Sequence, residues 1–109
     1  MSQHYFNTEH QGEPITVVLG WDRPLGHYFM LVERREPAPG QDDYLYINLD
    51  HADAFELELD DYRAKLEELG IKVPEVMFDE VERDCIQRVG NRQVVYDQDG
   101  RFQGATANA

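Results

Sequence analysis

The residues best suited to acid–base chemistry or metal binding in this chain of 109 residues are four histidines and one cysteine. No two histidines stand at the HExxH spacing, and there is no CxxC pair, so the sequence holds no zinc motif. We interpret His4 and His10 as surface residues on a frayed segment. His27 begins a predicted strand, where a capping role and a general-base role are alternatives. Cys85 falls on the apolar stripe of a predicted helix, which indicates a buried, inert thiol.

The densest group of potential ligands is the segment Asp50-His51-Ala52-Asp53. An EF-hand loop starting at Asp50 would need glycine at its sixth position and glutamate at its twelfth. These positions hold Phe55 and Asp61, so the motif fails. A looser divalent-cation site remains an alternative, with ligands from Asp42, Asp43, Asp50 and Asp53. The corresponding enzymatic hypothesis is a small metal-dependent enzyme or module that uses Asp50, His51, Asp53 and His27.

Other signatures of catalysis are missing from the sequence. There is no glycine-rich phosphate loop, no nucleophile elbow and no triad pattern. Paired carboxylates occur, but every acidic protein has such pairs, so they do not indicate glycoside hydrolysis. The sequence therefore predicts no catalytic residue, no bound metal and no cofactor, and it favours a non-enzymatic protein.

Negative charge is concentrated in the middle of the chain. The net charge is −12, and residues 36–84 hold 16 acidic and four basic residues, whereas the segments on either side are almost neutral. Such a field repels nucleic acid and anionic membranes and attracts basic proteins. We therefore expect a basic protein partner and no direct binding to nucleic acid or membrane.

Much of this charge falls on the outer faces of two predicted helices. The carboxylates concerned are Asp60, Asp61, Glu67, Glu68, Glu75, Asp79, Glu80 and Glu82. Like charges four residues apart, such as Glu75 and Asp79, destabilise a helix by a few tenths of a kcal/mol per pair. One interpretation is that the charge serves solubility. The other is that it forms a docking surface, in which carboxylates can occupy a groove meant for phosphates.

The segment from Trp21 to Gly26 is a second candidate for partner binding. A tryptophan and an arginine beside an exposed turn are typical anchors of interfaces, so Trp21 and Arg23 join the predicted site. Trp21 also keeps the alternation of Ile15, Val17 and Leu19. Its alternative role is therefore a core residue next to a local turn.

The elements that position these residues follow from hydrophobic periodicity. Strands are predicted at 15–21, 27–33, 44–49 and 93–96, with a short first strand around Tyr5 and Phe6. Helices are predicted at about 59–69 and 74–89, the first with a left-handed cap at Gly70. This order favours an α+β fold, a mainly antiparallel sheet of about four to five strands with a two-helix hairpin on one face. Residues 1–103 would form one domain and 104–109 a disordered tail.

Bulk features indicate the compartment. No apolar run approaches the roughly 18 residues that span a bilayer, and the first residues lack the pattern of a signal peptide. A single cysteine is typical of a reducing compartment. We expect a cytoplasmic protein.

Several segments resemble a group of short acidic bacterial proteins, some of them carried with mobile elements. The segments are Trp21–Leu25, Phe29–Val32, Tyr44–Tyr46, Asn48–Asp50, Ala64–Ile71, Val73–Glu75 and Val89–Arg92. The resemblance covers about Ile15 to Tyr96 but brings no assigned activity and no binding residue. A mobile-element setting implies accessory roles, such as inhibition of a nucleoprotein.

The leading hypothesis is a non-enzymatic interaction protein whose acidic helical surface binds a basic protein. A nucleic-acid-binding protein is one candidate target, and the chain would then act as a DNA mimic of the antitoxin, immunity or anti-defence type. The alternatives are the metal-dependent module described above and an acidic domain that acts through oligomerisation. A homodimer could use the tyrosine-bearing strand at 44–49 as its edge.

Overall fold

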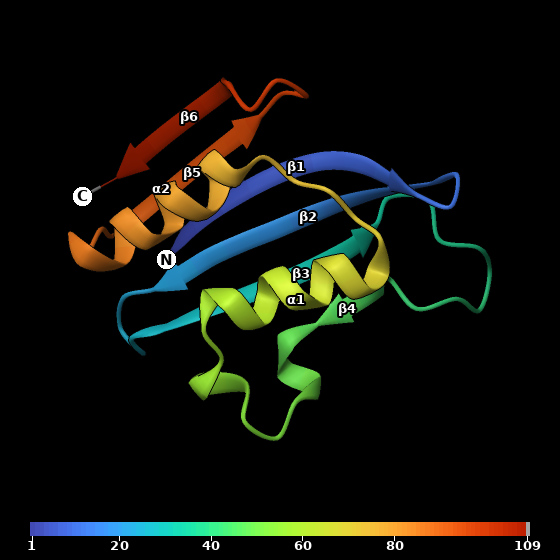
Figure 1. Ribbon diagram of the computed structural model, residues 1–109, viewed down its shortest axis with the longest axis horizontal. Coiled ribbons are helices and arrows are strands. Elements are labelled where there is room, and N and C mark those ends of the chain that lie inside the picture. The colour runs from blue at the N-terminus through green and yellow to red at the C-terminus, as the bar shows by residue number, and fades with distance from the viewer. Residues whose placement is uncertain (109) are drawn as a thin grey trace.

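The computed structural model describes residues 1–108 and shows one twisted sheet with two helices on one face (Figure 1). The strand order is β4-β3-β2-β1-β5-β6. The strands are β1 (Ser2–His10), β2 (Glu13–Asp22), β3 (His27–Arg34), β4 (Tyr44–Ile47), β5 (Asn91–Tyr96) and β6 (Phe102–Asn108). The helices are α1 (Leu59–Leu69) and α2 (Glu75–Ile86), with short 3-10 turns η1 (Asn48–Asp50) and η2 (Ala54–Glu56) before α1.

The sheet is mainly antiparallel, as predicted. Strands β1 to β4 follow one another as an antiparallel meander, and β6 pairs antiparallel with β5. The exception is β5, which lies beside β1 and runs parallel to it. A parallel neighbour needs a long crossover connection, and the segment with both helices provides it. The first strand of the chain therefore lies inside the sheet.

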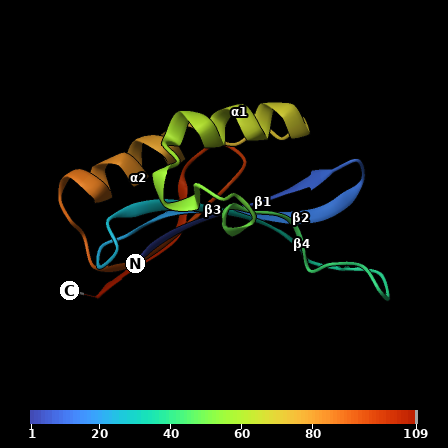
Figure 2. The same cartoon turned by 90° about the horizontal axis from the view of Figure 1, so that it is seen from below.

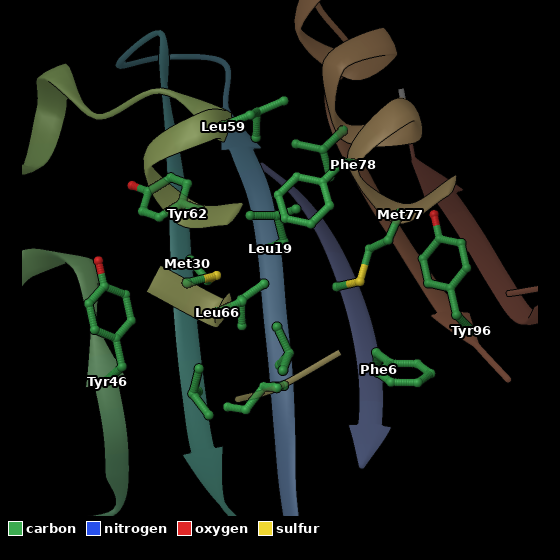
Figure 3. Close-up of a cluster of buried hydrophobic side chains, with 14 of the residues drawn as sticks. Phe6, Leu19, Met30, Tyr46, Leu59, Tyr62, Leu66, Met77, Phe78 and Tyr96 are labelled. Atoms are coloured by element: carbon green, nitrogen blue, oxygen red, sulfur yellow. The ribbon is translucent and has the colours of Figure 1, made fainter. Parts of the chain in front are cut away.

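The core lies between the sheet and the helix layer. Strand β2 contributes four alternate residues to it, namely Ile15, Val17, Leu19 and Trp21. Figure 3 shows side chains of both layers meeting, with Leu19 and Met30 on the strands near Leu66 and Phe78 on the helices. Because every second strand residue points the same way, the hydrophobic alternation read from the sequence sets this core.

Helix α1 has the predicted bounds, and capping contacts are present at both of its ends. Glu58 and Asp61 form a capping box at its start, and Gly70 adopts a left-handed φ of 73° at its end. The amide of Ile71 then donates to the carbonyl of Leu66 at 2.9 Å. These contacts satisfy backbone groups that a helix end leaves without partners.

Helix α2 ends three residues before the predicted bound at residue 89. It follows Pro74 and stops at Ile86, because Arg88 adopts a left-handed φ of 51°. The amide of Val89 donates to the carbonyl of Asp84 at 2.9 Å, which closes the last turn. The apolar residue at 89 fits the helical period but lies beyond the helix.

Both ends of the chain carry longer strands than expected. The segment around Tyr5 and Phe6 is a nine-residue strand, and residues 102–108 form β6. The predicted disordered tail is thus wrong for 104–108, whereas Ala109 lies outside the described residues. The small and polar residues of β6 have no hydrophobic periodicity that would predict a strand. A strand can nevertheless form by backbone pairing alone, and β6 pairs with the edge of β5. Neither described helix is long and apolar enough to cross a membrane.

Candidate functional site

Seven of the eight predicted helical carboxylates lie on the exposed side of α1 and α2. These seven, which we call the acidic helix surface, are Asp60, Asp61, Glu67, Glu68, Glu75, Asp79 and Glu82. The helices lie side by side on the same face of the sheet (Figures 1 and 2). The surface therefore belongs to one side of the molecule, although its residues come from two elements.

Three predicted site residues do not belong to this surface. Glu80 is buried and accepts one hydrogen bond from Arg92, whose guanidinium nitrogen lies 2.9 Å away. Trp21 is also buried, because it continues the inward alternation of β2. Neither side chain can reach a partner directly. Arg23 is exposed in the turn between β2 and β3, where its guanidinium lies near Gly90.

Arg63 joins the two helices across the acidic helix surface. Its guanidinium lies 2.7 Å from a carboxylate oxygen of Asp60 and 2.6 Å from one of Glu75. It also lies over the ring of Phe78, at 4.4 Å from the centroid. The hydrogen bond to Glu75 raises the pKa of Arg63, with a further contribution from Asp60. These contacts hold the start of α2 against α1.

Part of the acidic helix surface has no cation within ion-pair distance. Asp60 and Glu75 pair with Arg63, and Glu68 lies 3.4 Å from Lys65. Asp61 closes the capping box. The remaining three carboxylates form no ion pair with any described residue, and they are Glu67, Asp79 and Glu82. Their charge is available to a partner.

A cleft of about 430 Å³ opens beside this surface, between α1 and the segment that leads to α2. Its apolar lining includes Leu66, Ile71 and Phe78, and Glu67 and Glu75 contribute carboxylates. A second cleft of about 450 Å³ lies on the other side of the same connection and shares Glu75. The lining of the first cleft also contains the cations Arg63 and Lys72. An aliphatic side chain would match its apolar part.

The acidic loop residues do not converge on a metal site. No group of three or more histidine, cysteine, aspartate or glutamate side chains within the described part of the chain is arranged to hold a metal ion. Asp50 and Asp53 are exposed, and so is His51, whose ring nitrogen lies 3.0 Å from the hydroxyl of Tyr46. Asp42 and Asp43 are exposed as well. The geometry does not assemble the metal-dependent module that the sequence left open.

His27 is buried at the start of β3. Its Nδ1 lies 3.0 Å from the carbonyl oxygen of Tyr28, so the nitrogen donates to the backbone. Its ring lies against Phe55 with centroids 4.5 Å apart. These contacts make His27 part of the junction between the sheet and η2.

The structure also contains a buried polar network that the sequence reading missed. His4 is not a surface residue: its side chain has an exposed fraction of 0%, like that of Asp84. The imidazole Nε2 lies 2.6 Å from a carboxylate oxygen of Asp84, and Nδ1 lies 2.7 Å from the hydroxyl of Tyr96. Arg92 bridges the two carboxylates of Asp84 and Glu80, at 2.6 and 2.9 Å. The network thus ties β1 and β5 to α2.

Opposing effects set the protonation of this network. Burial alone would raise the pKa of Asp84, but hydrogen bonds from His4 and Arg92 outweigh it and lower that pKa below its ordinary value. Burial would lower the pKa of Arg92, yet its bonds to Glu80 and Asp84 raise it. Burial raises the pKa of Tyr96, so the phenol keeps its proton. The carboxylate and the guanidinium are therefore both charged at neutral pH.

The arrangement of His4, Asp84 and Tyr96 has the residue types of a proton relay, but all three side chains are buried. None of the three lines either cleft described above. Each is buried between the sheet and α2. Two sequence signals could have found the network: His4 alternates with Phe6, and Asp84 lies three residues after the inward-facing Val81. Its function is to hold two layers together.

Comparisons with protein-family models, with curated proteins and with solved structures gave no match.

Proposed function

We propose that this chain is a non-enzymatic protein whose acidic helix surface binds a basic protein. The observation that carries the proposal is the presence of seven exposed carboxylates on two adjacent helices, three of which make neither an ion pair nor a capping contact among the described residues. Carboxylates that already pair with Arg63 or Lys65 gain less from a new cation. Glu67, Asp79 and Glu82 therefore carry most of the expected attraction.

The cleft beside α1 supports this proposal. Surface charge speeds the association of two proteins and favours partners of opposite charge. At the exposed rim of an interface it contributes only modestly to affinity. A buried apolar contact can supply the affinity that exposed charge does not, because most of the binding energy of an interface comes from a few buried residues. The lining with Leu66, Ile71 and Phe78 can take an aliphatic or aromatic side chain of the partner. Glu67, which has no ion-pair partner among the described residues, can pair with a flanking lysine or arginine.

A protein that itself binds nucleic acid is the target class we favour. Its phosphate-binding groove presents lysines and arginines, which pair with carboxylates as they pair with phosphates. An inhibitor of the antitoxin, immunity or anti-defence type would act in this way. The resemblance to proteins carried with mobile elements is consistent with such a role in the cytoplasm.

The test compares two variants with the same loss of charge. The surface variant combines Glu67→Gln, Glu68→Gln, Asp79→Asn and Glu82→Gln, and the control combines Glu36→Gln, Asp42→Asn, Asp43→Asn and Asp53→Asn. All eight positions are exposed. Each protein is used to capture partners from a lysate of the source organism at low and high salt. Affinity for each captured protein is then measured by titration calorimetry.

We expect a basic partner whose affinity falls about tenfold or more with the surface variant, which corresponds to about 1.4 kcal/mol. The control should bind almost as the native chain does, because only its long-range field changes. Equal binding by both variants, or binding that does not weaken with salt, would show that the acidic helix surface is not the docking site.

A further inference from the structure

The two helices end with the same pattern of backbone hydrogen bonds. In each, one amide donates to the carbonyl three residues earlier, and the next amide donates to the carbonyl five residues earlier; the first of these amides belongs to Gly70 after α1 and to Arg88 after α2. The residue at this position is left-handed, with φ of 73° at Gly70 and 51° at Arg88. Glycine adopts that conformation without strain, whereas a residue with a Cβ atom does not. The chain thus has the expected residue at one helix end and a strained arginine at the other.

The contacts of Arg88 within the fold compensate little of this strain. Its guanidinium carbon lies 6.0 Å from the centroid of the Trp21 ring. That distance is the outer limit of a favourable cation–π contact. Arg88 is exposed and forms no ion pair with a described residue. The arginine side chain therefore occupies a position suited to glycine without a matching gain in stability.

A second arginine lies at the same place. The guanidinium carbon and both terminal nitrogens of Arg23 are 3.4–3.5 Å from the point that a Cβ atom at Gly90 would occupy, so the group lies flat against the backbone there. Arg23 comes two residues after Trp21. Gly90, in turn, comes two residues after Arg88. Both guanidinium groups therefore lie where the β2–β3 turn meets the segment between α2 and β5, and Figures 1 and 2 show these two segments at the same end of the molecule. We call Arg23 and Arg88 the arginine junction.

Carboxylates are abundant in this chain, yet the arginine junction has none within ion-pair distance among the described residues. The chain has 22 acidic and ten basic residues. The basic residues that form ion pairs with described carboxylates are Arg34, Arg63, Lys65, Arg83 and Arg92. The carboxylate of Asp22, next to Arg23 in the sequence, accepts from the amide of Leu25 at 3.2 Å and so belongs to the turn. Two cations placed together without a counter-ion repel each other, and an anion between them would remove that repulsion.

We propose that the arginine junction binds the phosphate group of a small molecule. The planar fork of a guanidinium group donates two parallel hydrogen bonds to a pair of oxygens. A carboxylate has only two oxygens, enough for one fork, whereas a phosphate group offers oxygens to both arginines. Contact with Gly90 uses the face of the Arg23 guanidinium plane and leaves its N–H edges for the ligand. The strained arginine after α2 is then explained by the ligand that its side chain binds.

The charge of the rest of the chain limits the ligand to a small anion. The net charge is −12, and the acidic helix surface includes part of α2, the helix that Arg88 follows. A long polyanion such as nucleic acid would extend over these carboxylates and be repelled. A single phosphate group covers only the arginine junction. At physiological salt the Debye length is about 8 Å, so carboxylates farther away oppose its binding only weakly.

Titration with inorganic phosphate, followed by NMR at constant ionic strength, tests the proposal. We expect saturable shifts of the amides at 21–26 and 87–91 and of the Nε–H groups of Arg23 and Arg88, with a dissociation constant of about 1–10 mM. Adenosine monophosphate is the second probe. Equal affinity for both probes would assign the site to free phosphate, and tighter binding of the nucleotide to a phosphate ester. Shifts that do not saturate by about 100 mM phosphate, ten times the weakest expected constant, would overturn the proposal.

Single substitutions locate the site. Arg23→Gln and Arg88→Gln each remove one charged fork and should weaken phosphate binding about tenfold or more. The matched control is Arg35→Gln, since Arg35 is also exposed and forms no ion pair with a described residue. It should leave the affinity within about twofold, because only the long-range field changes. Equal affinity in all three variants would mean that phosphate follows the general charge of the surface, and the proposal would then be wrong.

Arg88→Gly separates ligand binding from support of the fold. Without phosphate it should raise the melting temperature by about 4 °C, because glycine relieves the left-handed strain. Added phosphate should then raise the melting temperature of the native chain but not that of the variant. A variant that melts at a lower temperature and still binds phosphate would show that Arg88 supports the helix end instead, which would overturn the proposal. These readouts are independent of partner binding to the acidic helix surface.

Discussion

Replacing Asp84 with asparagine should destabilise the fold by about 3 kcal/mol. The native carboxylate accepts from His4 and Arg92, both at 2.6 Å, and it is completely shielded from water. Removing one partner of a buried ion pair costs about 3–5 kcal/mol, because the remaining charge is buried without compensation. Two features place the loss at the lower end: the asparagine oxygen can still accept one bond, and Arg92 keeps its contact with Glu80 at 2.9 Å.

Acid should reduce the difference in unfolding free energy between the native protein and the Asp84→Asn variant. The pKa of Asp84 is lowered in the folded state, from an ordinary value of 3.8. A lowered pKa means that the unfolded chain binds protons first, so this contribution is complete above pH ~4 and declines as pH falls through the folded pKa. Asparagine has no such titration. The gap in unfolding free energy should therefore be constant near neutral pH and narrow below pH ~4.

Urea unfolding monitored by circular dichroism at a series of pH values measures both effects. Asp79→Asn is the matched control, since this carboxylate is exposed on the same helix and has no ion-pair partner among the described residues. It should change stability by less than about 0.5 kcal/mol, with relief of its repulsion from Glu75 as the main effect. A loss below about 1 kcal/mol for Asp84→Asn, or a gap independent of pH, would refute the view that charge pairing stabilises this junction.

Three other substitutions test separate parts of the fold, each by its change in unfolding free energy. Tyr96→Phe removes the hydroxyl bound to His4 at 2.7 Å and should cost about 1–2 kcal/mol; an unchanged stability would mean that the imidazole finds another partner. Gly20→Ala would overlap the Ser2 carbonyl and the Phe29 ring and should cost about 3 kcal/mol or more, and a neutral result would contradict the close packing on β2. Gly70→Ala meets open space but a φ of 73°, so it should cost only about 1–2 kcal/mol; a larger loss would point to crowding.

The elements with strong periodicity could be predicted from the sequence. Helix α1 has its expected bounds because an apolar stripe, acidic first turn and Gly70 all agree. The hairpin of β2 and β3 follows from alternation around a turn with proline and glycine. Where local signals were weak, the prediction failed: β6 consists mostly of small or polar residues and forms through backbone pairing to β5.

The candidate functional residues could also be predicted where local periodicity is strong, but not where contacts between distant segments position them. Exposure of the helical carboxylates follows from helical periodicity, and seven of eight are where the sequence indicated. Glu80 differs because Arg92, twelve residues away, draws it inward. The partners of His4 lie 80 and 92 residues away in the chain. No local pattern encodes such pairs, since they depend on β5 returning beside β1.

The parallel pairing of β1 with β5 has a consequence for synthesis of the chain. Strand β1 ends at residue 10, but its second neighbour begins at residue 91. At about 5–20 residues per second, the ribosome needs roughly 4–16 seconds to make the intervening segment. During that interval one edge of β1 stays open and can pair with another nascent chain. Residues 36–84, which carry 16 acidic and four basic residues, emerge in this same interval. Like charge on two such chains opposes this pairing at close range.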